Sequence, residues 1–139
     1  MTVSEISEIL AVITVAWPNS ELAKADDRLM RLTVSVWADA TKDIDVFFGK
    51  RAIKALCKKS KFQPTIAEFI EEAKTQEREY EEKLFQHWQM YAALGPEEYE
   101  NAFGKNAVLP LMLQSHDFDE FEKLCRSKQL GHARKELPK

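Results

Sequence analysis

The stretch Ser60-Lys61-Phe62-Gln63-Pro64-Thr65-Ile66-Ala67-Glu68-Phe69 decides the fold of this 139-residue chain. Pro64 disfavours the helical conformation in the residue before it, so the chain is expected to be extended up to this point. Thr65 and Glu68 stand three positions apart, as in a capping box, where each side chain accepts a hydrogen bond from the other residue's backbone N–H. The stretch therefore predicts the end of one helix, a short extended connector and the start of the next helix.

Three helices are expected before this connector. The first begins at another capping box, formed by Thr2 and Glu5. The second covers about 26–38, and the third runs from Asp43, its expected cap, to about Ser60. Apolar residues recur in all three at the three- and four-residue spacing of an amphipathic helix. The expected buried faces are Ile6, Ile9, Leu10, Ile13 and Trp17 in the first; Leu29, Leu32, Thr33, Val36 and Trp37 in the second; and Ile44, Phe47, Phe48, Ile53, Leu56 and Cys57 in the third.

The fourth helix is expected to be long. It meets no Gly or Pro between Ile66 and Leu94, so about thirty residues can stay helical. Its apolar content falls over residues 74–83, and a helix that is polar almost all round usually bridges two packing units. We therefore expect a boundary near 75–83. Two or three short helices are expected after it, at 96–103, 107–115 and 118–127.

These patterns predict an all-α protein in three parts. Residues 1–75 are expected to form a compact four-helix N-terminal domain that buries Trp17 and Trp37. Residues 76–103 form an acidic helical connector, and residues 104–139 a C-terminal helical segment that binds a partner. The charge divides in a similar way, with net values of +2 over 1–61, −7 over 62–103 and +2 over 104–139, which leaves −3 for the chain.

Composition and motifs argue against several classes of protein. Even the long stretches without a charged residue, such as Ile9–Ser20, are shorter than the roughly 20 residues that span a bilayer, so no membrane association is expected. Two cysteines form no disulfide framework, which favours a cytoplasmic protein. No phosphate-binding glycine loop occurs, and His87, His116 and His132 are too scattered to suggest a metal site. The sequence predicts neither an enzyme nor a bound cofactor or metal.

A run of cations before the connector is the first candidate interaction surface. Four lysines step by four, four and three residues along one helical face, with an arginine beside them: Lys50, Lys54, Lys58, Lys61 and Arg51. Such a stripe can bind phosphates or an acidic protein surface, or it can be a solvated face whose cations favour a helix C-terminus. The interleaved aromatics on which single strands stack are missing from this face. With a negative net charge, we expect no tight direct binding of DNA.

The second candidate surface is apolar and lies towards the C-terminus. Residues 104–139 are too few to bury a core of their own easily. Their apolar side chains therefore either fold back onto the N-terminal helices or offer an amphipathic helix to a partner's groove. The polar stretch 74–83 separates the two parts, which favours the partner. The expected binding residues are Trp88, Tyr91, Leu109, Leu111, Met112, Leu113, Phe118, Phe121 and Leu124.

Three motifs connect residues 3–75 to a known family. Trp17-Pro18 follows the first helix, Trp37 lies in the second, and Phe62–Glu68 fits the pattern F-x-P-T/S-x-A-E. In these features the chain resembles the phage replicative helicase loader/inhibitor family. In that family the N-terminal domain is folded and the segment after it engages the helicase, so the resemblance implies that the nine apolar residues of the second candidate surface form the helicase contact.

The resemblance implies a function without catalysis. It suggests an adaptor that binds a hexameric DnaB-type replicative helicase, keeps it inactive and delivers it to a phage replication origin complex. An origin-binding initiator protein is then a further candidate partner, and the bacterial host cytoplasm the expected location. The alternative is a phage-encoded DNA-binding regulator that uses the basic stripe at 50–61.

Overall fold

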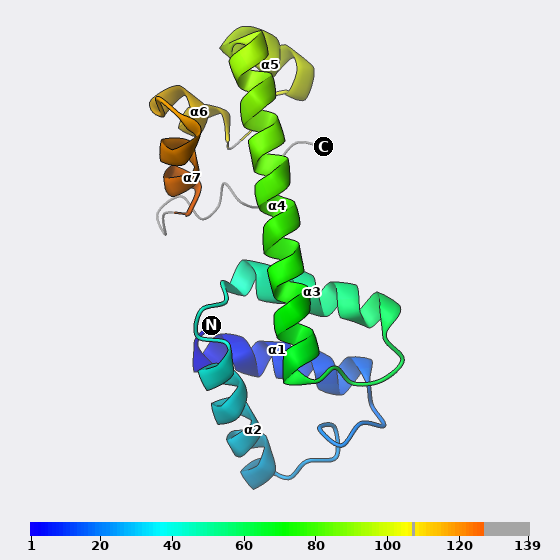
Figure 1. Cartoon of the computed structure of the whole chain (residues 1–139). Coiled ribbons are helices and arrows are strands. Elements are labelled where there is room, and N and C mark those ends of the chain that lie inside the picture. The colour runs from blue at the N-terminus through cyan, green and yellow to red at the C-terminus, as the bar shows by residue number, and fades with distance from the viewer. Residues whose placement is uncertain (107, 127–139) are drawn as a thin grey trace. The chain divides into compact units, whose positions relative to one another are not determined.

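The computed structural model describes residues 1–106 and 108–126, and within these ranges every regular element is a helix (Figure 1). This confirms the all-α prediction. None of the helices in the described ranges is long and apolar enough to cross a membrane. The chain divides into two units, Met1–Arg78 and a second one that begins at Glu79. The functional division into three parts stays a prediction.

Four helices build the first unit: α1 (Val3–Ala16), α2 (Asp27–Ala40), α3 (Val46–Lys59) and the start of α4 (Ile66–Leu94). Helix α1 contacts both α2 and α3. Its predicted face is confirmed, because Ile6, Ile9, Leu10 and Ile13 are all buried in the core. Trp17 and Trp37 are also buried, as expected, with 8% and 5% of their surface exposed.

The capping boxes predicted for α1 and α4 are both present. The Glu5 N–H donates to Thr2 Oγ1 at 3.2 Å, and the Thr2 N–H donates to Glu5 Oε2 at 2.8 Å. At the start of α4 the Glu68 N–H donates to Thr65 Oγ1 at 3.1 Å, and the Thr65 N–H donates to Glu68 Oε1 at 3.3 Å. Both helix starts follow from residues only three positions apart.

The cap predicted for α3 is wrong by two residues. Asp45, not Asp43, is the N-cap, and its carboxylate accepts a hydrogen bond from the Phe47 N–H at 2.8 Å. The Ile44 N–H donates to the Thr41 carbonyl at 3.1 Å, so the chain still turns away from α2 at this point. Asp43 lies within that turn and precedes the helix.

The buried face predicted for α2 is also largely wrong. Trp37 is buried, but Leu29, Leu32 and Val36 are exposed. The residues that pack against the core with Trp37 are instead Met30, Val34 and Ala38. Apolar residues occur on more than one side of α2, so helical spacing alone does not select a face. The Trp37 ring decides the orientation, because it packs against the Phe69 ring of α4 with centroids 5.4 Å apart.

Helix α3 buries a narrower arc than the sequence suggested. Its buried residues are Phe48, Gly49, Ala52, Ile53 and Leu56. Cys57 was expected on this face but is exposed. With 3.6 residues per turn, the position after Leu56 is rotated by more than a quarter of a turn and falls beyond the edge of the arc.

The second unit contains the rest of α4 and three short helices, α5 (Pro96–Phe103), α6 (Leu109–Gln114) and α7 (Phe118–Arg126). Asp117 directly precedes α7 and caps it. The Asp117 carboxylate accepts a hydrogen bond from the Glu120 N–H at 2.8 Å. The expected helices 107–115 and 118–127 correspond to α6 and α7, and their outer residues 107 and 127 lie outside the described part of the chain.

We expect the two cysteines to react at different rates with a thiol reagent. Cys57 is exposed and should be modified quickly in the folded protein, whereas Cys125 is 1% exposed and should react only as the second unit opens. Thiolate release in an Ellman assay measures both phases. The Cys57→Ser variant should lose the fast phase, and a fast phase that survives in this variant would contradict the orientation of α3.

Candidate functional site

The connector between α3 and α4 is held in place by the core. The Trp17 indole Nε1–H donates to the Ser60 carbonyl at 3.3 Å, and the Leu22 N–H donates to Gln63 Oε1 at 3.3 Å. Pro64 is fully buried. Contacts on both sides therefore fix the short segment that contains Phe62.

Phe62 is the most exposed large hydrophobic residue of the described chain, with 84% of its surface accessible. It borders a hollow of about 390 Å³ between the connector and the end of α1. The hollow is lined by Ala16, Trp17, Pro18, Asn19, Ser20, Lys61, Phe62 and Gln63. In the sequence Phe62 belongs to a helix-start motif, and this motif does not indicate that Phe62 is a surface residue. The sequence does contain an indication of this exposure. An aromatic residue that follows Lys61 in a connector has no helical face on which to be buried.

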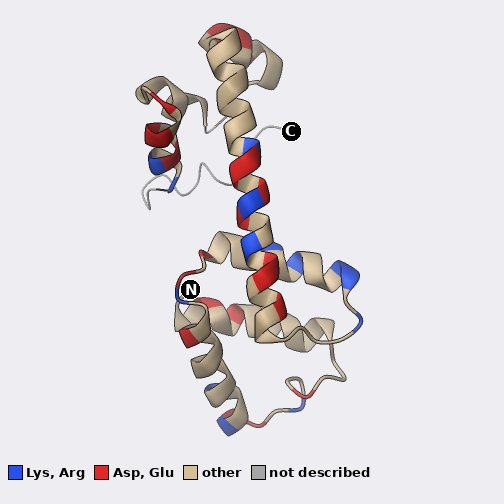
Figure 2. Ribbon diagram, viewed as in Figure 1, with Lys and Arg blue, Asp and Glu red and all other residues tan. Residues whose placement is uncertain are grey.

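The five residues of the predicted basic stripe lie on α3 and in the connector and are all exposed. Figure 2 shows the basic segments of α3 as blue ribbon. Two of the five residues bind within the first unit. Lys50 pairs with Glu8 of α1 at 3.6 Å. Arg51 Nε–H donates to Gln76 Oε1 at 3.4 Å, and its guanidinium lies 5.5 Å from the centre of the Phe47 ring.

The remaining three residues of the stripe point to solvent. Within residues 1–106 and 108–126, the side chains of Lys54, Lys58 and Lys61 make neither an ion pair nor a hydrogen bond. The structure thus separates the predicted stripe into two cations that have partners within the first unit and three that are available to a partner molecule. These three lie within eight residues of Phe62 along the chain.

A further lysine of α3 has a structural partner. Lys59 Nζ lies 2.5 Å from Glu72 Oε2, and Gln76 Nε2–H donates to Glu72 Oε1 at 3.0 Å. The Glu72 carboxylate is mostly buried, and its hydrogen bond with Lys59 lowers its pKa from the ordinary value. This group connects α3 to α4 and is one reason why Lys59 does not belong to the available cations.

The nine apolar residues predicted to bind a helicase pack mostly within the second unit. The expectation that they lack a local core is wrong, because the second half of α4 supplies buried residues such as Leu84, and α5 supplies Tyr99. Of the nine, Leu109, Leu111, Met112 and Phe121 are buried; Trp88, Tyr91, Phe118 and Leu124 are half-buried; and Leu113 is 56% exposed. Trp88 stacks on Phe121 with ring centroids 5.3 Å apart.

A buried polar pair lies in the same core. The Tyr99 hydroxyl is 2.9 Å from His87 Nδ1, and the Phe103 ring packs 5.0 Å from the His87 ring. Burial raises the pKa of Tyr99 to about 12, so its phenol stays protonated at neutral pH. His87 is 2% exposed and packs in the core of the second unit. The described residues contain no group of three or more His, Cys, Asp or Glu side chains that could hold a metal ion. His132, also considered from the sequence, lies outside the described residues.

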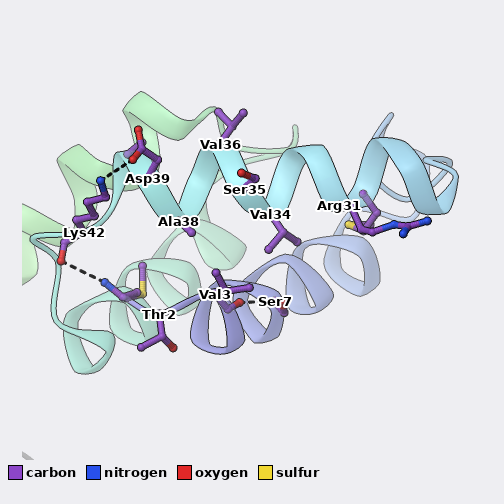
Figure 3. Close-up of a pocket in the computed structure, with 13 residues that line it drawn as sticks. Thr2, Val3, Ser7, Arg31, Val34, Ser35, Val36, Ala38, Asp39 and Lys42 are labelled. Carbon is purple, nitrogen blue, oxygen red and sulfur yellow. Dashed lines mark hydrogen bonds and ion pairs between the residues drawn. The ribbon is translucent and has the colours of Figure 1, made fainter.

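A groove between α1 and α2 is a third surface, which the sequence analysis did not find. This open groove has a volume of about 1060 Å³, and its lining includes Val3, Met30, Val34 and Ala38. Figure 3 shows Val3 of α1 facing α2, and Val34 and Ala38 of α2 facing α1. An ion pair of 2.7 Å, between Asp39 and Lys42, lies at one end. The groove was missed because the wrong face of α2 was expected to be buried.

Comparison with known proteins identifies a family for the first unit. Residues 1–70 match the model of the phage helicase loader/inhibitor gp39, N-terminal domain. No curated protein and no solved structure matches the chain. The matched residues cover half of the sequence and nearly all of the first unit.

The Glu72→Gln variant tests the electrostatic connection between α3 and α4. We expect it to lower the free energy of unfolding of the first unit by about 1.5 kcal/mol at neutral pH. Because the pKa of Glu72 is lowered on folding, this stabilisation is fully present above the ordinary glutamate pKa of about 4.3 and is lost as the pH falls through the lowered value. The difference between the variant and the parent protein should therefore shrink in acid.

Urea titrations at neutral and acidic pH measure this effect. In a Trp88→Phe background the remaining fluorescence comes from Trp17 and Trp37, so it reports on the first unit. Glu71→Gln, at an exposed neighbouring position, is the matched control and should change little. Equal losses in both variants, or a loss that does not depend on pH, would contradict the assigned role of Glu72.

Proposed function

The chain belongs to the phage helicase loader/inhibitor family defined by the gp39 N-terminal domain, and from this we propose that it is a non-enzymatic adaptor for a replicative helicase. It binds a hexameric DnaB-type helicase, keeps the helicase inactive and delivers it to a phage replication origin complex. The family match over residues 1–70 carries this proposal. An origin-binding initiator protein is the second proposed partner, and the host cytoplasm, where these partners work, is the proposed location.

We place the helicase contact on the second unit, at those predicted residues that remain accessible. Leu113 at the end of α6 is exposed, and Trp88, Tyr91, Phe118 and Leu124 are half-buried. The buried members of the set pack beneath these accessible side chains, as the stacking of Trp88 on Phe121 illustrates. Apolar and aromatic side chains that are already held in position lose little conformational freedom on binding, which favours affinity.

This placement assigns two roles to the nine residues. The four buried ones build the core on which the surface rests, so their substitution would act through folding. The exposed and half-buried ones would meet the partner directly, and residues near the centre of an interface typically dominate its binding energy. Leu113 is the best probe of the contact, because its exposure allows substitution without opening the core.

Helicase activity gives the direct test of the proposal. Addition of the purified protein to its cognate replicative helicase should lower the rate of ATP hydrolysis by the helicase, and the protein alone should show none. A coupled ATPase assay at increasing protein concentration measures both rates. A helicase whose turnover stays constant at saturating protein would refute an inhibitory loader.

The location of the contact is tested separately. Leu113→Glu should weaken helicase binding by about 2 kcal/mol, or roughly thirtyfold, as measured by biolayer interferometry. The control is Val15→Glu in α1, which introduces the same charge at an even more exposed apolar residue of the first unit and should leave affinity unchanged. If Val15→Glu weakens binding and Leu113→Glu does not, the contact lies on the first unit instead.

A further inference from the structure

We propose that Lys54, Lys58, Lys61 and Phe62 form a binding site for single-stranded DNA on the first unit, distinct from the helicase contact. The three lysines would bind phosphates, and the Phe62 ring would stack on a base. This adds a second ligand to the function proposed above and does not depend on it.

The cations of α3 are not equivalent, and this gives the site its extent. Lys50 is held by Glu8, Arg51 by Gln76 and Lys59 by Glu72. The side chains left without such partners in the described chain are those of Lys54, Lys58 and Lys61, towards the C-terminal end of α3 and in the connector. No acidic residue occurs between Val46 and Lys61, so no carboxylate within this segment offsets its positive charge. Charge of this kind selects an anionic ligand.

The exposed ring of Phe62 indicates that the anionic ligand also carries a base, which can stack on the ring. Burial of a phenylalanine side chain is favourable, and Phe62, with 84% of its surface accessible, forgoes nearly all of that stabilisation. The residues on either side of the ring are tied to the first unit, because the Trp17 indole donates to the Ser60 carbonyl and the Leu22 N–H donates to the Gln63 side chain. An exposed aromatic ring together with exposed cations is the combination that proteins use to bind single strands, because the cations bind the backbone and the ring stacks on a base.

The hollow beside Phe62 favours a base over an aliphatic side chain. Asn19 and Ser20 are part of its lining, together with Pro18 and the edge of Trp17. The Ser20 hydroxyl oxygen accepts from the Ala23 N–H at 3.2 Å, which leaves the hydroxyl proton able to donate. Amide and hydroxyl groups of this kind pair with the edges of bases. A single strand can offer both an unstacked base and its phosphate, whereas bases in a duplex are stacked on each other.

The expected binding is weak and depends on salt. Three phosphate contacts to a single strand correspond to a slope of about −2 in a plot of log K against log salt. This agrees with the expectation of no tight direct DNA binding, which follows from the net charge of −3.

Fluorescence anisotropy with a labelled oligothymidylate of about 20 nucleotides tests the site on the full chain. Phe62→Leu keeps an apolar side chain but removes the ring, and we expect it to weaken binding about tenfold. Phe62→Tyr keeps the ring and should bind like the parent protein. Because Phe62 is exposed, both variants should fold normally. Equal affinities of the leucine and tyrosine variants would overturn the stacking role.

A second pair of variants tests the phosphate contacts. Lys58→Gln/Lys61→Gln should weaken binding and make the salt slope shallower by about 1.4. Lys105→Gln/Lys123→Gln, at two exposed lysines of the second unit, makes the same change in net charge and should have no effect. If both double variants weaken binding equally, the attraction is a property of total charge and the site is refuted.

Two further ligands complete the test. A duplex of the same length should bind more weakly than the single strand, and equal binding would refute recognition of an unstacked base. Poly-glutamate should not compete at a matched charge concentration. Effective competition by poly-glutamate, with Phe62→Leu unchanged, would assign the cations to an acidic protein surface instead of DNA.

Discussion

The hydrogen bond between the Trp17 indole and the Ser60 carbonyl joins the end of α1 to the end of α3, which are 43 residues apart in sequence. Trp17 is itself part of the core, and the connector after Ser60 ends at the buried Pro64. The connector therefore cannot shift without disturbing the core. Since α4 begins directly after it, this constraint also determines where Phe69 meets Trp37, and so how α2 is oriented in the unit.

The features that the sequence predicts well are local. A capping box involves two residues three positions apart, so Thr65 and Glu68 define the start of α4 whatever lies around them. The wrong assignments concern tertiary packing. Whether α2 turns Leu32 or Val34 towards the core depends on the Trp37–Phe69 contact, and residue 69 is far from α2 in sequence. Cys57 was misplaced for a related reason, because spacing identifies the middle of a buried arc better than its edge.

The candidate sites show the same difference: the sequence reveals the pattern of residues, but the groups that contact them come from other helices. The stripe from Lys50 to Lys61 is visible in the sequence, but the acidic and amide groups that engage some of its cations come from α1 and α4. In the second unit, the apolar residues after 104 were considered without the second half of α4, with which they share a core. The contact between His87 and Tyr99 was likewise hidden, because the two residues lie on either side of the turn at Gly95.

Helix α4 belongs to both units, since the boundary between them falls at Arg78 and Glu79 inside it. Starting a helix is unfavourable because several residues must be ordered for the first hydrogen bond, whereas each later residue adds a bond at a much smaller entropic cost. In α4 the capping box and the packing against the core of the first unit offset this initial entropic cost. Residues 79–94 therefore extend an existing helix and do not have to nucleate one. On a ribosome, where the N-terminal residues emerge first, the completed first unit would supply a helix already started, which residues 79–94 continue.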